Sequence, residues 1–371
     1  MATGFFWDEL CFWHGGGNYA LTVPVGGFVQ PLPAGLPENP ETKRRLVNLM
    51  NISGLARELA MQSAPPANRA QMARIHPDAY LDRFKEMSDA GGGELGRRTP
   101  FGKGGFEQAA QSAGLAIGAL DAVLSGQLNN AYALSRPPGH HCLPDFPNGF
   151  CLLNNIGIAL ENARAQGLVQ RAVILDWDVH HGNGSEHIYI DRSDTYTISL
   201  HQDCNYPMDT GGFEVRGQGA GLGTNLNIPL PPGAGHVSYL EAMDRIVVPE
   251  IAKFDPDVII VACGFDASCL DPLSRMMATS ETFRQMTRKV KELAHRVCKG
   301  RLVLVHEGGY SEVHVPFCGH AVLEELSGST VHVPDPLEET LSARQPKERM
   351  NSMVSGLIDE YVDALQIAPA P

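Results

Sequence analysis

Short apolar and β-branched runs alternate with helix-like apolar periodicity from about residue 107 onward. The runs have the length of buried strands, and the segments between them repeat apolar residues at helical spacing. We expect strands at 131–135, 172–176, 196–201, 225–228, 257–263 and 301–306. We expect helices between them at 107–125, 155–166, 236–253 and 280–299. This alternation predicts an α/β fold with a mainly parallel sheet flanked by helices.

The first 106 residues break this pattern, because glycine and proline interrupt them repeatedly. Within them we expect helices at 40–63 and 78–88. This portion could cover the sheet, shape the mouth of a site or contact another subunit, and its glycine-rich segment 15–35 is long enough to narrow the mouth or join subunits. A homo-oligomer is therefore one of the expected states of the protein.

The chain is predicted to be a single domain of residues 1–371, because no repeat and no sharp change in composition marks a boundary. Its length alone fits either one large α/β domain or two ordinary ones. The C-terminal extension is expected to add one helix, at 348–365. We divide the domain into a loop-rich N-terminal portion, a core and this extension, at 1–106, 107–330 and 331–371.

Composition and charge argue against several classes of function. Hydrophobic residues make up 43% of the chain and charged residues 19%, and no apolar run approaches the roughly 20 residues that a membrane helix needs. The net charge of −13 disfavours nucleic acid as a partner, since its phosphates would be repelled. The first residues carry acid where a signal peptide carries base. We therefore expect a cytoplasmic protein with no nucleic-acid or membrane partner.

The first candidate for chemistry directly follows the expected strand 172–176. Asp176, Asp178 and His180 are spaced at i, i+2 and i+4, so on an extended backbone they share one face, while Trp177 and Val179 point the other way. Carboxylate and imidazole ligands together suit zinc or another divalent transition metal. The spacing therefore predicts a metal or acid/base site at the carboxyl end of this strand.

Three further clusters of polar residues each follow an expected strand. They are the histidine pair His140–His141, the aspartate Asp266, and the segment His306-Glu307-Gly308-Gly309-Tyr310. Each has a simpler structural explanation on its own, such as a core histidine, a turn aspartate or a glycine turn. Open α/β sheets bind their ligands at the carboxyl ends of the strands, and all four clusters are expected there. Together they favour a catalytic site.

The order of these motifs resembles that of the zinc-dependent deacetylases of the arginase/deacetylase fold. The most similar members are class II histone deacetylases, bacterial histone deacetylase-like amidohydrolases and acetylpolyamine amidohydrolases. The resemblance runs from about residue 40 to about residue 327. It rests on Arg136-Pro137-Pro138-Gly139-His140-His141, Gly149-Phe150-Cys151, the run from Asp176 to Gly184, Ser199-Leu200-His201, Gly264-Phe265-Asp266 and Glu307-Gly308-Gly309-Tyr310. It implies one catalytic domain with its active site at the carboxyl ends of the strands.

The resemblance implies two metal sites. Zinc would be bound by the side chains of Asp178, His180 and Asp266, which would leave a position for water and the substrate carbonyl. A monovalent cation, expected to be potassium, would be held largely by main-chain oxygens. Its ligands would come from Asp176, Asp178, His180, Ser199 and Leu200.

The resemblance also implies the roles of five catalytic side chains. His141 would act as the general base towards water and then as the acid towards the leaving amine. His140 would assist electrostatically and would be oriented by Asp176, while Asn183 would support His141. Because some class I relatives carry aspartate in place of Asn183, His141 is expected to be less basic here. Tyr310 would donate a hydrogen bond to the carbonyl and to the oxyanion that develops from it.

Substrate contacts are expected from Gly149, Phe150, Tyr206, Leu273 and Gly308. Phe150 and Tyr206 would form the walls of a tunnel, with the Gly149 carbonyl accepting from the scissile amide. Tyr206 replaces the usual phenylalanine and adds a hydroxyl to the wall. Leu273 stands where specialised polyamine deacetylases carry a glutamate, which disfavours that specificity. No residue matches the rim aspartate that holds peptide backbones in many histone deacetylases.

The sequence thus predicts a zinc-dependent amidohydrolase that hydrolyses the amide of a small acylated amine or acyl-lysine. Acetylpolyamines and other small carboxamides, including xenobiotics, are alternative substrates for the same chemistry. A catalytically weak module that binds acyl-lysine is disfavoured by Tyr310, because relatives with weakened activity replace that tyrosine. A binuclear manganese hydrolase of the arginase type would need more aspartate and histidine ligands than the motifs supply.

Overall fold

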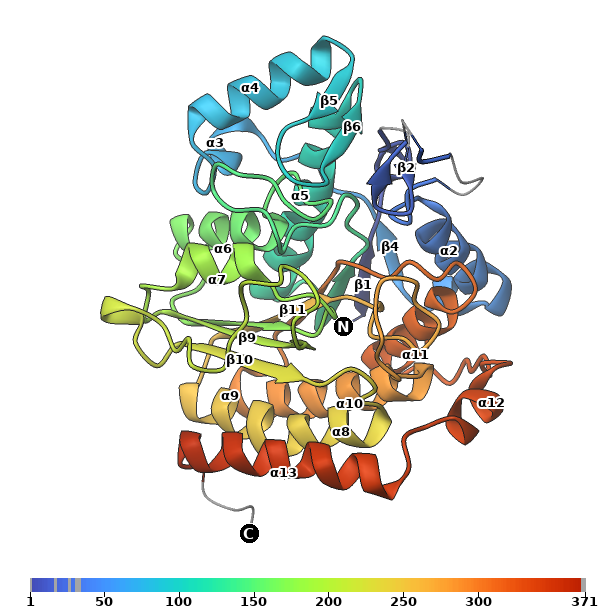
Figure 1. The fold of residues 1–371 in the computed structure, drawn as a ribbon. Coiled ribbons are helices and arrows are strands. Elements are labelled where there is room, and N and C mark those ends of the chain that lie inside the picture. The colour runs from blue at the N-terminus through green and yellow to red at the C-terminus, as the bar shows by residue number, and fades with distance from the viewer. Residues whose placement is uncertain (1, 17–18, 26–27, 31–34, 368–371) are drawn as a thin grey trace.

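An eight-stranded sheet forms the centre of the protein, and all of its strand pairs are parallel (Figure 1). The structure is a computed structural model that describes residues 2–16, 19–25, 28–30 and 35–367. The strand order is β10-β9-β8-β11-β12-β7-β1-β4. In chain order these strands are β1 (Thr3–Phe6), β4 (Ala60–Gln62), β7 (Asn130–Ala133), β8 (Ala172–Asp176), β9 (Thr195–Gln202), β10 (Asn225–Leu230), β11 (Val258–Cys263) and β12 (Leu302–His306).

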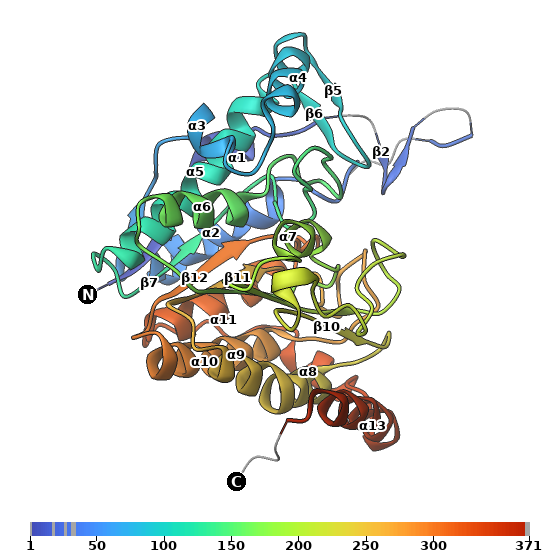
Figure 2. The ribbon, with the colours of Figure 1, turned by 90° about the vertical axis from the view of Figure 1, so that its left-hand side faces the viewer.

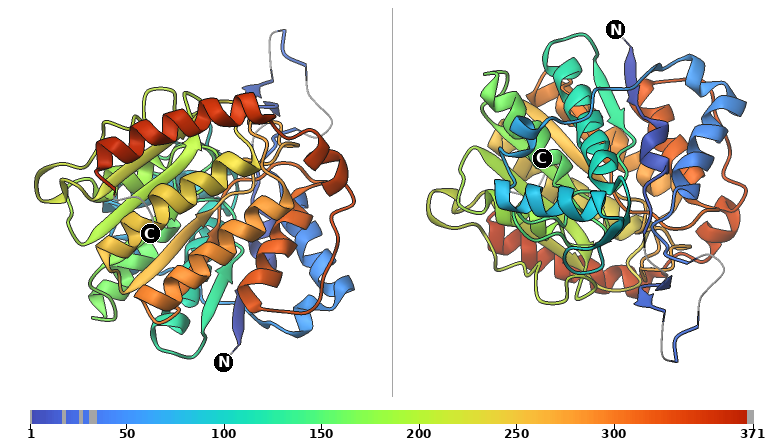
Figure 3. Two further views of the ribbon diagram at one scale, coloured as in Figure 1. Left: turned by 90° about the horizontal axis from the view of Figure 1, so that it is seen from below. Right: turned by 90° about the horizontal axis from the view of Figure 1, so that it is seen from above.

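Helices cover both faces of this sheet (Figure 2). On one face lie α5 (Gly105–Leu124) and α6 (Asn155–Ala165), with α1 (Glu9–Phe12), α3 (Arg69–Met72), α4 (Asp78–Asp89) and α7 (Asn183–Tyr189) on the same side. The other face is covered by α8 (His236–Ala242), α9 (Val248–Phe254), α10 (Ser280–Val297) and α11 (Val315–Ser327), and α13 (Glu348–Leu365) packs outside α8 (Figure 3). Because both faces are covered, the central strands are buried along their whole length. Their sequences are therefore continuous apolar runs.

The remaining elements lie at the edges of this core. Helix α2 (Glu41–Ser53) packs against α11, and α12 (Glu338–Ala343) precedes α13. Two short antiparallel pairs join β2 (Tyr19–Ala20) to β3 (Val23–Pro24) and β5 (Gly92–Glu94) to β6 (Pro100–Gly102). Single turns of 3₁₀ helix occur at η1 (Leu55–Arg57) and η2 (Gly219–Gly221). No helix in the described part of the chain combines the length and the apolar character needed to cross a membrane.

The six expected strands and the four expected core helices are all present; strand 172–176 has the predicted ends, and the ends of the others are shifted. The expected helix 236–253 is present as α8 and α9, which are joined without a gap by a π turn, η3 (Met243–Val247). This turn lies just before Pro249, which lacks the backbone N–H that an α-helix needs.

The N-terminal portion differs from the expectation. The helix predicted at 40–63 is wrong beyond residue 53, because Gly54 adopts a left-handed conformation with φ of 91° and ends α2. The chain then forms η1 and the edge strand β4. Strands β1 and β4 are only 4 and 3 residues long, too short for their periodicity to show in the sequence. Helix α11 is also absent from the prediction.

Candidate active site

The polar clusters that follow β7, β8, β11 and β12 meet at one edge of the sheet, because these strands are neighbours and parallel. The register places Asp176 beside Ala262 of β11, and Cys263 beside His306 of β12. After β8 successive side chains point to alternate sides of the backbone, as the spacing predicts. Trp177 and Val179 are fully buried in the core, while the side chains of Asp178 and His180 point to the opposite side, towards Asp266.

Asp178, His180 and Asp266 form a compact group of possible metal ligands, with ligand atoms that all lie within 4.8 Å of one another. His180 Nδ1 lies 3.1 Å from Asp178 Oδ1 and 3.0 Å from Asp266 Oδ2. The other oxygen of each carboxylate accepts a backbone N–H: Gly308 N to Asp178 Oδ2 at 2.7 Å and Val179 N to Asp266 Oδ1 at 2.8 Å. The peptide groups therefore fix the carboxylates so that one oxygen of each faces the imidazole.

Gly308 makes this arrangement possible by its lack of a side chain. A Cβ there would lie 2.1 Å from Asp266 Oδ2 and 2.6 Å from Asp178 Oδ2. Only glycine lets the backbone approach both carboxylates this closely. In the structure Gly308 lies behind the ligand group rather than among the residues that line the cavity, and its expected contact with substrate stays a prediction.

The histidine pair is held by two different partners. His140 Nδ1 lies 2.8 Å from Asp176 Oδ2, and His141 Nδ1 lies 2.7 Å from Asn183 Oδ1. Since an amide oxygen only accepts, this contact places the proton of neutral His141 on Nδ1 and leaves the lone pair of Nε2 free. The two rings are 4.0 Å apart between centroids. The pair thus combines a carboxylate-paired histidine with one that can accept a proton.

The electrostatics of the two histidines differ accordingly. Burial lowers the pKa of His140, but the carboxylates of Asp176 and Asp178 outweigh it, so the net pKa lies well above the ordinary value. Burial lowers the pKa of His141, and the charges of His140 and His180 lower it further. His141 is therefore neutral at a pH where His140 is charged, which is the state that a general base requires.

A cavity of about 220 Å³ leads from the surface to this site. His141, His180 and Tyr310 line its inner part, and its other lining residues are Leu21, Thr22, Arg98, Gly149, Phe150, Asn205, Tyr206, Pro272, Leu273 and Arg275. The expected tunnel residues Gly149, Phe150, Tyr206 and Leu273 are thus brought together. Leu21 and Thr22 belong to the glycine-rich segment 15–35, so this segment helps to shape the mouth. Residues 17–18, 26–27 and 31–34 of it lie outside the described residues.

Tyr310 closes the inner end of the cavity. Its ring lies 5.8 Å from that of Phe150 and 6.4 Å from that of His180, between centroids. Burial raises the pKa of the Tyr310 phenol well above its usual value, and the carboxylates of Asp266 and Asp178 add to this. The phenol therefore stays protonated and can donate a hydrogen bond at neutral pH.

Sequence reasoning missed the support given by Asp271. Its carboxylate accepts the N–H of Tyr310 and the N–H of Leu273, each at 2.8 Å. Asp271 lies in the same loop as Asp266 but carries no motif of its own. Its role follows only from the three-dimensional approach of the loops after β11 and β12. Asn148, which accepts the hydroxyl hydrogen bond of Tyr206, was missed for the same reason.

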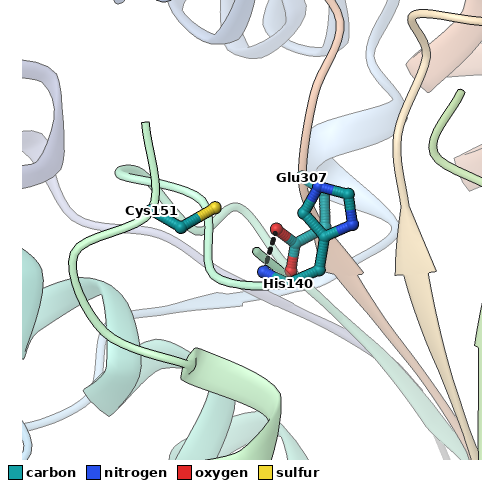
Figure 4. A group of neighbouring side chains, drawn as sticks. All are labelled: His140, Cys151 and Glu307. Atoms are coloured by element: carbon teal, nitrogen blue, oxygen red, sulfur yellow. Dashed lines mark hydrogen bonds between the residues drawn. The ribbon is translucent and has the colours of Figure 1, made fainter. Parts of the chain in front are cut away.

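Glu307 belongs to the quoted motif but had no assigned role. Its Oε2 accepts the backbone N–H groups of Gly139 at 2.7 Å and His140 at 3.1 Å, and burial raises its pKa to about 7. Figure 4 shows this carboxylate beside the backbone of His140, with Cys151 further along the same connection between β7 and α6. Glu307, His140 and Cys151 form a second group of possible metal ligands among the described residues. Two features disfavour a metal there, because His140 Nδ1 is hydrogen-bonded to Asp176 and burial raises the pKa of the Cys151 thiol. The Glu307 carboxylate thus holds the backbone of the histidine pair in place.

The residues expected to hold a monovalent cation lie close to the group of possible metal ligands, and Asp178 and His180 belong to both sets. The parallel pairing of β8 with β9 places Asp176 opposite Ser199, and buried Leu200 follows in β9. Asp176 Oδ1 also accepts the N–H of Asp178 at 3.0 Å, which tightens the turn after β8. The structure therefore brings these five residues to one place, and the cation itself stays a prediction.

Comparison with known proteins agrees with this geometry. Residues 36–326 match the family model of the histone deacetylase domain. The chain belongs to the histone deacetylase family. It is 53% identical over 369 residues to the histone deacetylase-like amidohydrolase of Pseudomonas aeruginosa, with 99% of this chain and 97% of the relative covered. It is 36% identical over 298 residues to a probable deacetylase of Archaeoglobus fulgidus, with 79% and 82% covered.

A solved structure has the same architecture. The crystal structure of the HDA15 HD domain superposes with a TM-score of 0.82 at 26% identity, and 98% of this chain and 96% of that chain are covered. The predicted arginase/deacetylase-like fold and the predicted family are both confirmed. Family membership places the protein among deacetylases and amidohydrolases.

Proposed function

We propose that the protein is a zinc-dependent deacetylase that hydrolyses the amide of a small acylated amine or acyl-lysine. The observation that supports this most directly is that three convergent ligands, a neutral histidine and a protonated tyrosine surround the inner end of one cavity. A metal ligand set alone could be structural. A base and an oxyanion donor beside it are the parts that hydrolysis needs.

The donor set fits zinc. Two carboxylates and one imidazole converge on one point, and the cavity reaches His180, so a further position remains open to water and substrate. Zinc bound there would polarise the substrate carbonyl and lower the pKa of a water molecule. Asp178, His180 and Asp266 would hold it, with the N–H of Gly308 fixing the Asp178 carboxylate and the N–H of Val179 fixing that of Asp266.

The side chains of the protein would then divide the proton transfers between them. His141 Nε2 takes a proton from water as it attacks the carbonyl carbon, and His141 later returns a proton to the nitrogen of the leaving amine. His140, charged and paired with Asp176, stabilises negative charge near the reacting atoms. Tyr310 donates its hydroxyl hydrogen bond to the oxygen of the former carbonyl, where charge develops.

We extend the proposal to a potassium ion bound by main-chain oxygens of Asp176, Asp178, His180, Ser199 and Leu200. The turn from Asp176 to His180 supplies two of the three zinc ligands, so a cation there would stiffen the ligand set. The presence of Tyr310 in the cavity favours catalysis over a module that only binds acyl groups.

Removal of the metal provides the direct test of the proposed function. Dialysis against a chelator is expected to abolish turnover of an acetyl-lysine reporter, and one equivalent of zinc should restore it. A hydroxamate, which chelates zinc, should inhibit the restored enzyme. Metal content and turnover are measured on the same samples. Undiminished turnover by protein shown to be free of metal would refute the proposal.

A second prediction concerns Asn183, whose Oδ1 contacts His141 Nδ1. Asn183→Asp places a negative charge beside this nitrogen, which favours the protonated imidazole and raises the pKa of His141. The base must be neutral to act, so the acid limb of the pH profile of kcat/KM should move to higher pH, by about one unit. An acid limb that stays in place, or moves to lower pH, would contradict the assignment of His141 as the base.

A further inference from the structure

The outer part of the active-site cavity is positively charged. Arg98 and Arg275 both line it, and no aspartate or glutamate is among its described lining residues. This is a local exception, since the whole chain has a net charge of −13. A ligand that enters the cavity therefore meets two guanidinium groups before it reaches the candidate zinc site.

The backbone of Arg98 is fixed to the tunnel wall. Its carbonyl oxygen accepts the N–H of Phe150 at 2.9 Å, and the preceding carbonyl of Arg97 accepts the N–H of Gly149 at 3.0 Å. Arg98 also adopts a left-handed conformation, with φ of 58°, which a non-glycine residue keeps only where its surroundings hold it there. The side chain thus starts from a fixed point beside the residues that are expected to contact substrate.

The Arg98 guanidinium is available to a ligand. It lies over the ring of Tyr206, 5.1 Å from the centroid, which orients it along the cavity wall. No described residue forms an ion pair with it or accepts a hydrogen bond from its side chain. Glu94 is the last residue of β5, just before the loop that carries Arg98, but its carboxylate accepts hydrogen bonds from Tyr19 Oη at 2.9 Å and Thr99 N at 3.1 Å.

Arg275 lies on the loop that carries Leu273. Its N–H donates to Gln202 Oε1 at 2.7 Å, and its carbonyl oxygen accepts the N–H of Gly233 at 2.7 Å, so its backbone is fixed too. Its guanidinium donates only to backbone oxygens of its own loop, those of Pro272 and Ser274, among the described residues. Its charge is therefore not neutralised by any carboxylate of the described chain.

The direction of the cavity decides which end of a substrate meets these charges. If the proposed function holds, the scissile carbonyl lies at the inner end beside Tyr310, and the chain of the leaving amine extends outward to the mouth. We propose that the mouth selects small acylated amines that carry a carboxylate at the far end of the amine chain. A guanidinium without a partner recognises a carboxylate by charge and paired hydrogen bonds. Acylated polyamines would bring a cation to the same place and be repelled.

Three substrates that differ only in their terminal charge provide the test. They are ω-acetamido carboxylates with four to six methylene groups, the corresponding neutral primary amides, and the corresponding acetylated diamines. We expect kcat/KM of the best carboxylate to exceed that of its neutral amide by roughly tenfold and that of the diamine by more. The advantage should shrink as salt is added, because the mouth is partly exposed.

Variants of Arg98 assign the preference to a residue. Arg98→Gln should lose most of the roughly tenfold advantage in kcat/KM of the carboxylate. It should leave kcat/KM of the neutral amide within about twofold of the parent value, whereas Arg98→Lys should keep part of the advantage. Arg57→Gln, an exposed site away from the cavity with the same change in charge, is the matched control. Arg275→Gln tests the second guanidinium in the same way.

The outcomes separate the two proposals. Equal turnover of all three substrates, or preference for the diamine, would overturn the charge selection and leave the deacetylase activity standing. A carboxylate preference that survives both Arg98→Gln and Arg275→Gln would overturn its assignment to the mouth. If the zinc-loaded protein hydrolyses none of the compounds and no acetyl-lysine reporter, the proposed function itself is wrong, and this inference fails with it.

Discussion

Replacing Asp178 with alanine is expected to empty the zinc site and to lower turnover of an acetyl-lysine reporter by about 10³-fold or more, on the scale of a lost metal contribution of several kcal/mol. Asp178 offers one of three converging ligand atoms and also accepts the N–H of Gly308 at 2.7 Å and of His180 at 2.9 Å. Its loss thus removes a ligand and releases the two backbone segments that shape the site. Zinc content by elemental analysis and kcat on the same preparation measure both effects.

The control for this variant is Asp257→Ala. Asp257 also accepts two backbone N–H groups, from Gln170 at 2.9 Å and Arg171 at 2.8 Å, but it precedes β11 at the opposite end of the sheet. Its loss should reduce the free energy of unfolding by about 1–3 kcal/mol and leave zinc content and kcat unchanged. Full zinc occupancy in Asp178→Ala would show that the ligand assignment is wrong.

Tyr310→Phe is expected to keep zinc and to lower kcat by about 10²-fold or more, which is the effect of losing one oxyanion donor. The ring packs between Phe150 and His180, so phenylalanine can occupy the same space. KM should change little, because the hydroxyl acts mainly on the charge that develops in the transition state.

Tyr206→Phe is the matched control, since Tyr206 also lines the cavity and loses only a hydroxyl. That hydroxyl donates to Asn148 rather than towards the inner end of the cavity. Its removal should change kcat by less than about tenfold, well short of the loss of an oxyanion donor. If Tyr310→Phe turned over at a near-normal rate, or no more slowly than Tyr206→Phe, Tyr310 would not be the oxyanion donor.

The central sheet could be predicted from the sequence because its strands are buried on both faces and therefore form unbroken apolar runs. Spacing also placed Asp176, Asp178 and His180 on one face. It could not divide their roles, since Asp176 contacts His140 while the other two face Asp266, 86 to 88 residues away in the chain. Contacts between distant segments are not encoded in local periodicity.

The same limit explains which residues sequence reasoning overlooked. Edge strands β1 and β4 contribute too few residues to form a pattern. Arg98 lies in a glycine-rich stretch with no catalytic motif, and it reaches the cavity only because its loop is hydrogen-bonded to Phe150. Asp271 likewise gains its role from a partner, Tyr310, that comes 39 residues later.

The two hydrogen bonds of Asp271 connect the shape of the cavity mouth, which acts on substrate choice, with the position of Tyr310, which acts on turnover. One of its oxygens fixes the backbone of Leu273, in the loop that forms the mouth, and the other fixes the backbone of Tyr310 at the reacting end. A substitution that reshapes residues 272–275 for a new substrate will therefore disturb the position of the phenol through this carboxylate. Attempts to broaden the substrate range should vary the side chains of this loop and retain Asp271. Replacing Asp271 would change the mouth and displace the phenol of Tyr310 together, so a change in selectivity would come with a change in turnover.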